Sequence, residues 1–98
     1  MEILASIDHR AGRHLQAIDQ YRQALELRKT IGDTYLEADT LEKLGCSYFA
    51  LGDYGQARRI WQLALQFYRQ QGREEDVARA WQYLPRVNSA RAILDESP

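Results

Sequence analysis

The sequence has 98 residues, enough for one domain or for one part of a longer repeat array. Its 13 basic and 14 acidic residues give a formal net charge of −1, which counts against a nucleic-acid-binding protein. Cys46 is the only cysteine, which excludes an internal disulfide framework and favours a reducing compartment. The chain starts without the apolar core of a signal peptide, and no stretch approaches the ~20 apolar residues of a membrane span. We therefore expect a cytoplasmic protein with no membrane partner.

Glycines divide the chain into segments whose apolar residues recur at spacings of three and four, the pattern of amphipathic helices. Gly32-Asp33 and Gly52-Asp53 each place a glycine where a helix can end, followed by an aspartate that can accept hydrogen bonds from the next helix. The turns are short, which predicts antiparallel hairpins. We predict helices at residues 2–11, 14–31, 34–51, 54–71 and 74–84, and a short sixth helix at 85–94.

The sequence repeats itself at an offset of 40 residues. Eight of the 34 positions from 12 to 45 are identical to the position 40 residues later, and they are glycines and small or apolar residues with one glutamine. Periods of this size indicate a solenoid of stacked helices. We therefore predict a single domain over residues 1–98, with a partial first repeat at 1–32, a full repeat at 33–72, and a partial third repeat with a tail at 73–98.

The full repeat carries a family pattern. It is Leu41-x-x-Leu44-Gly45-x-x-Tyr48-x-x-x-Gly52-Asp53-Tyr54-x-x-Ala57-x-x-x-Trp61-x-x-Ala64. This pattern resembles the tetratricopeptide repeat (TPR), and its longer period is similar to the variety found in kinesin light chains and in bacterial signalling proteins and regulators. The resemblance implies an all-α fold of antiparallel helix hairpins stacked as a short right-handed superhelix. Pro85 departs from the pattern, because proline disrupts a helix interior, so the last repeat should bend or stop near Leu84.

The resemblance also implies a function, namely the recognition of another protein through a concave groove lined by the first helix of each hairpin. The implied groove residues of the middle unit are Asp39, Glu42, Cys46 and Phe49. Arg79, Gln82, Arg86 and Ser89 continue the groove, and Glu2, Ser6 and His9 are the equivalents in the first unit. An acidic middle beside an arginine-bearing end favours a ligand of mixed charge. The Lys/Asn clamp that co-chaperone members use for a terminal carboxylate is missing.

Residues that could suggest chemistry have simpler interpretations. His9 and His14 lie five apart, whereas two metal ligands on one helix face need a spacing of three or four. Cys46 has no histidine near it in sequence to act as a base. The acidic run Glu74-Glu75-Asp76 begins a helix, where negative charge offsets the helix dipole. We therefore predict that the chain is not an enzyme and that it has no cofactor and no metal site.

One feature predicts an additional contact. Ile60, Leu63 and Phe67 form a second apolar stripe on the helix at 54–71, whereas the first repeat has Gln20 and Gln23 at the first two positions. Such a stripe should be covered. The alternatives are the chain's own tail around Val87, Ile93 and Leu94, or the same stripe of a second copy in a homodimer. Self-association through this stripe and the incomplete repeat ends is thus the alternative function.

Overall fold

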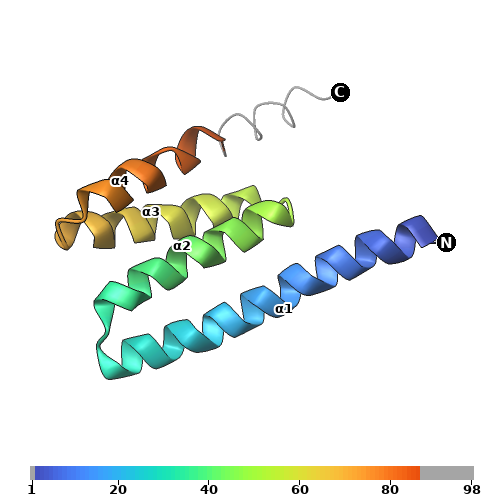
Figure 1. Cartoon of the computed structure of the whole chain (residues 1–98), viewed down its shortest axis with the longest axis horizontal. Helices are drawn as coiled ribbons and strands as arrows, with labels where there is room; N and C mark the ends of the chain where they lie inside the picture. The colour runs from blue at the N-terminus through green and yellow to red at the C-terminus, as the bar shows by residue number, and fades with distance from the viewer. Residues whose placement is uncertain (1, 87–98) are drawn as a thin grey trace.

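The computed structural model describes the backbone of residues 2–86 and, from residue 12 onward, their side chains. Four helices make up this part of the chain: α1 (Glu2–Ile31), α2 (Thr34–Ala50), α3 (Tyr54–Gln70) and α4 (Glu74–Trp81). Successive helices run antiparallel, and α1 and α4 lie on opposite sides of the α2–α3 hairpin (Figure 1). The prediction of an all-helical chain is confirmed for residues 2–86, and the right-handed superhelix stays a prediction.

Three tight turns join the helices as the glycines predicted. Gly32, Gly52 and Gly72 have φ angles of +74°, +85° and +67°, in the left-handed region that suits glycine. The side chains of Asp33 and Asp53 then accept hydrogen bonds from the backbone N–H groups of Leu36 and Gln56, at 3.0 and 3.3 Å. Because each turn has the same form, α2 and α4 begin 40 residues apart, at positions 34 and 74.

The predicted break at Gly12 is wrong, because α1 continues through it as one helix from Glu2 to Ile31. Gly12 does not have the positive φ angle of the three turn glycines. It is followed by Arg13 rather than by a capping aspartate, and a single glycine inside a helix costs only ~1 kcal/mol relative to alanine. The two helices predicted at 2–11 and 14–31 are therefore a single element.

The chain bends before Pro85, three residues earlier than predicted. The helix α4 ends at Trp81, residue 82 is a turn, and residues 83–86 form one further helical turn. The cause is the missing N–H of Pro85, which would have bonded to the carbonyl of Trp81 in a continuous helix, while the proline ring clashes with that carbonyl. The end of the predicted sixth helix, 87–94, lies outside the described residues, as does Ser89.

The core lies between the helices and centres on Trp61, whose side chain is 2% exposed. Its indole N–H donates to the backbone carbonyl of Glu42 at 3.1 Å, and its ring stacks on Tyr83 with centroids 4.6 Å apart. Gly45 on α2 makes this position available, because a Cβ there would lie 2.5 Å from the indole ring. The other buried apolar residues are Ile18, Ala38, Leu41, Leu44, Tyr48, Ala57, Ile60, Ala64, Leu65, Tyr68 and Ala80.

The apolar stripe predicted on α3 has more than one environment. Ile60 is buried in the core and, with Leu63, lines a hollow between α1, α2 and α3, so α1 and α2 contribute cover that the sequence analysis had assigned to the tail or to a second copy. Leu63 remains 43% exposed, and Phe67 is half-buried. Gln20 and Gln23, the equivalents of Ile60 and Leu63 on α1, are exposed. The stripe is therefore largely a contact between successive repeats.

Candidate functional site

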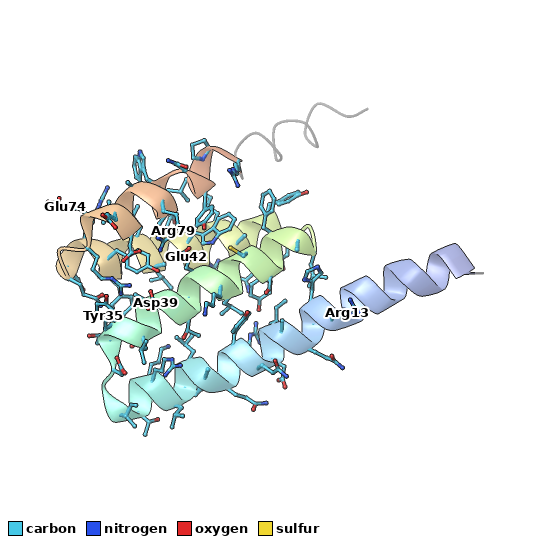
Figure 2. The ribbon with its side chains drawn as sticks, in the orientation of Figure 1. Arg13, Tyr35, Asp39, Glu42, Glu74 and Arg79 are labelled. Carbon is cyan, nitrogen blue, oxygen red and sulfur yellow. The ribbon has the colours of Figure 1, made fainter. Side chains whose placement is uncertain are left out.

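The carboxylate of Glu42 joins three helices on the face shared by α2 and α4. It accepts hydrogen bonds from the Tyr68 hydroxyl on α3 at 2.7 Å and from the Tyr83 hydroxyl at 2.9 Å. It also accepts two bonds from the Arg79 guanidinium on α4, at 2.9 and 2.7 Å, in the bidentate geometry that arginine and carboxylate favour. Figure 2 shows Glu42 and Arg79 facing each other across the space between α2 and α4.

A second arginine, Arg73, joins the start of α4 to α2. Its guanidinium contacts Asp39 at 2.6 Å and Asp76 at 2.8 Å, and it donates to the backbone carbonyl of Tyr35 at 3.0 Å. It also lies over the rings of Tyr35 and Tyr68, 3.7 and 4.5 Å from their centroids. The side chain of Arg73 is only 11% exposed, so this residue is a structural connection rather than a free surface charge.

The two groups form one network, because Asp76 contacts both Arg73 and, at 2.6 Å, Arg79. We call it the α2–α4 cluster. It consists of Asp39, Glu42, Tyr68, Arg73, Asp76, Arg79 and Tyr83. Three of its residues are acidic and two are basic, so most of the charge is balanced within the cluster.

The hydrogen bonds of the cluster shift the ionisation of its members. Burial alone would raise the pKa of the Glu42 carboxyl, but hydrogen bonds from Arg79, Tyr68 and Tyr83 outweigh it and place the pKa below the ordinary value of 4.5. Burial, together with the hydrogen bond to Glu42, raises the pKa of Tyr83 to about 12. Burial and the nearby Glu42 charge also raise the pKa of Cys46. This thiol therefore lacks the lowered pKa that activates a cysteine nucleophile.

Comparison with known proteins identifies the fold. The sequence model of the family described as tetratricopeptide repeat matches residues 1–82, most of the chain. The chain belongs to the tetratricopeptide repeat family. No curated protein and no solved structure gives a significant match to the chain. The resemblance seen in the sequence is confirmed at the level of the family, and the kinesin light chain-like variety stays a prediction.

The TPR fold brings the predicted groove residues of α2 and α4 to one face, with different degrees of exposure. Asp39, Glu42 and Arg79 belong to the cluster, and their side chains are 32%, 14% and 46% exposed. Cys46 is exposed on α2. Phe49 is half-buried, with its ring 5.1 Å from the Tyr54 ring and 5.6 Å from the Trp61 ring, measured between centroids. Gln82 and Arg86 are exposed. For Glu2, Ser6 and His9 only the backbone is described, as part of α1.

Four members of the cluster were missed by sequence analysis. Tyr68 was taken only as a core residue, and Asp76 was assigned to the helix dipole. Arg73 occupies the position where the other two turns have Asp33 and Asp53, and this exchange of charge was the available signal. It caps α4 without a side-chain hydrogen bond and instead contacts Asp39 and Asp76. Tyr83 gave no signal, because its partner Glu42 lies 41 residues away in sequence.

Two searches bear on other kinds of site. Over residues 2–86, no helix has the length and apolar character needed to cross a membrane. Within the same part of the chain, His, Cys, Asp and Glu side chains form no group of three that could hold a metal ion.

Proposed function

We propose that this chain is a protein-interaction module that binds a segment of another protein across the α2–α4 face. The TPR family generally mediates protein–protein interactions, and the helices concerned are the first helices of successive hairpins. The observation that carries the proposal is the state of Asp39 and Arg79. Each is held by the α2–α4 cluster, yet their side chains remain 32% and 46% exposed.

Partial pairing leaves each of these two groups with capacity for a ligand. Asp39 uses its Oδ1 atom for Arg73 and Tyr68, and among the described residues no donor reaches its Oδ2 atom. Arg79 uses Nε and Nη2, and no acceptor among the same residues bonds its Nη1 atom. Because the cluster already fixes both side chains, a ligand would lose little rotamer entropy on binding them. A segment of mixed charge fits a carboxylate and a guanidinium on one face.

The wider setting is also part of the proposal. A module of this kind suits a regulatory or scaffolding system, in which it holds two proteins together without chemistry of its own. A cytoplasmic location agrees with the single cysteine, Cys46, and with its exposure.

Selection from a displayed peptide library of random sequence tests this function. We expect the wild-type chain to enrich peptides that carry both acidic and basic residues. Arg79→Gln should abolish the preference for an acidic position, because the amide cannot replace the guanidinium. Lys43→Gln is the matched control, since Lys43 is exposed on α2 and lies outside the cluster. Failure to enrich any family of peptides, or enrichment that Arg79→Gln leaves unchanged, would contradict the proposal.

Self-association is the second candidate, and the exposure of Leu63 at 43% beside the half-buried Phe67 favours it. Light scattering over a concentration series distinguishes the two functions. A module that binds other proteins should remain a monomer, both as wild type and as Leu63→Glu. A homodimer that uses the stripe of Ile60, Leu63 and Phe67 should dissociate on the same substitution without unfolding, because an exposed leucine contributes little to the fold.

A further inference from the structure

A second surface, on the far side of α3 from α1, has the form of an unfilled site for a helix. It is a hollow of about 480 Å³ between α3 and α4, which we call the terminal hollow. Its lining residues are Gln62, Leu65, Gln66, Arg69, Trp81 and Leu84. It includes none of the residues of the α2–α4 cluster, so it is distinct from the face proposed above.

The terminal hollow repeats an internal hollow of the same molecule. The inner hollow, of about 360 Å³, lies between α1, α2 and α3. Six of its lining residues, from α1 and α2, are found 40 positions before the six of the terminal hollow. The pairs are Arg22 and Gln62, Leu25 and Leu65, Glu26 and Gln66, Lys29 and Arg69, Leu41 and Trp81, and Leu44 and Leu84. The same two walls are thus built twice, one repeat apart.

The two hollows differ in their third wall. In the inner hollow, α3 supplies it with Gln56, Ile60 and Leu63. The terminal hollow has no such wall among the described residues, and the positions 40 residues after Ile60 and Leu63 exceed the 98 residues of the sequence. The effect on exposure is large. Leu41 is 4% exposed in the inner hollow, whereas its counterpart Trp81 is 54% exposed.

Charge indicates what kind of helix fits. The only charged residue that lines the terminal hollow is Arg69, whose guanidinium lies over the Trp81 ring at 5.3 Å from the centroid. The inner hollow has Glu26 at the position of Gln66, so an acid present there is missing here. The helix α3 carries Arg58, Arg59 and Arg69 and no acidic residue. An incoming helix with carboxylates beside its apolar residues would be attracted to this side of the molecule.

We propose that the terminal hollow binds an acidic amphipathic helix of a different protein. The helix would present two apolar residues spaced three apart, as Ile60 and Leu63 are on α3, and a carboxylate within reach of Arg69. The helix α1 of a second copy fits less well, because it carries Gln20 and Gln23 at the positions equivalent to Ile60 and Leu63. Binding here goes beyond the recognition of a segment by the α2–α4 face and uses different residues.

The chain itself supplies a probe. A fluorescently labelled peptide with the sequence of α3 carries the third wall of the inner hollow, and the substitutions Arg59→Glu and Gln66→Glu make it acidic on both sides of Leu63. Fluorescence anisotropy at low salt would compare this acidic peptide with the unaltered, basic α3 peptide on the full chain. We expect the acidic peptide to bind more tightly, because the exposed charges of α3 are all basic.

Variants of the full chain locate the binding. Trp81→Ala should weaken binding of the acidic peptide by about tenfold or more, as the loss of a central aromatic contact does. Arg69→Glu should reverse the order of the two peptides, and it folds readily because Arg69 is exposed. Arg58→Glu is the matched control, with the same change of charge on α3 outside the hollow, and should leave the order unchanged.

Four results would overturn the proposal. Equal effects of Arg69→Glu and Arg58→Glu would mean unspecific attraction to a basic helix, and binding that Trp81→Ala does not alter would place the peptide elsewhere. Light scattering that shows a dimer dissociated by the acidic peptide would make a second copy the occupant. Binding strengthened about tenfold or more by Ile93→Asp with Leu94→Asp would make the chain's own C-terminal segment the occupant.

Discussion

At the residue scale, Glu42 shows how one carboxylate connects elements that are distant in sequence. It lies on α2, and the groups that donate to it come from α3, from α4 and from the turn that follows α4. Hydrogen bonds to a charged group stabilise a fold more than neutral ones, provided that every buried partner is satisfied. Over the described residues no buried side-chain nitrogen or oxygen atom lacks a partner. The cluster therefore contributes to stability as well as to the proposed binding face.

The lowered pKa of Glu42 predicts how this contribution depends on pH. A carboxyl with a lowered pKa in the folded state stabilises the fold above its unfolded pKa, and the contribution is lost as the pH falls through the folded value. Glu42→Gln should therefore be less stable than wild type at neutral pH by about 1–3 kcal/mol. The difference should shrink as the pH falls below the ordinary value of 4.5. Urea unfolding at neutral pH and at about pH 3 measures both terms.

Glu26→Gln is the control for this experiment, because Glu26 is exposed and lies outside the cluster. It should change stability little at either pH. A gap between wild type and Glu42→Gln that is equally large in acid and at neutral pH would mean that the amide disturbs the structure for a reason other than lost charge.

At the scale of elements, the approach of α2 to α3 depends on one residue without a side chain. A Cβ at Gly45 would lie 2.5 Å from two atoms of the Trp61 ring, and that ring is 2% exposed and rigid, so it cannot turn aside. Gly45→Ala gains up to ~1 kcal/mol in helix propensity. Forcing a methyl group into a filled core costs typically 1–3 kcal/mol. We therefore expect a net loss of about 1–2 kcal/mol in the free energy of unfolding, measured by urea denaturation.

Gly55→Ala is the matched control, because Gly55 lies in α3 with open space where its Cβ would be. It should be neutral or stabilising by up to ~1 kcal/mol. If Gly45→Ala proved as stable as Gly55→Ala, the close contact between Gly45 and Trp61 would not set the distance between the two helices.

The same elements show how far sequence reasoning reaches. The turns at Gly32 and Gly52 were predictable, because glycine and the aspartate after it act within four residues of chain. Gly12 was not, since a glycine is tolerated in a helix and only the surrounding structure decides whether the chain turns there. The cover of Ile60 by α1 and α2, and the bonds of Arg73, depend on segments brought together by folding. A single sequence carries no direct record of such contacts.

At the scale of the whole molecule, α4 is the element that depends most on its connections. It has eight residues, of which only Ala80 is buried, and an isolated helix of this length is unstable in water. Its attachment comes largely from Arg73 and Arg79, which join it to Asp39 and Glu42 on α2. Both proposed binding surfaces include α4, so its docking decides whether either surface exists.

Arg73→Ala should therefore release α4 while leaving the α2–α3 hairpin folded. The substitution removes two ion pairs, a bond to the Tyr35 carbonyl and stacking on two tyrosine rings, and it leaves the Asp39 and Asp76 carboxylates without this partner. We expect a loss of about 2–4 kcal/mol in the local stability of α4. Native-state hydrogen exchange would show it as faster exchange at residues 77–81, with the core amides of α2 and α3 little changed. Arg58→Ala, an exposed arginine of α3, should leave both sets of rates unaltered. Equal acceleration throughout α2, α3 and α4 would mean instead that the three helices unfold as one unit and that α4 cannot detach alone.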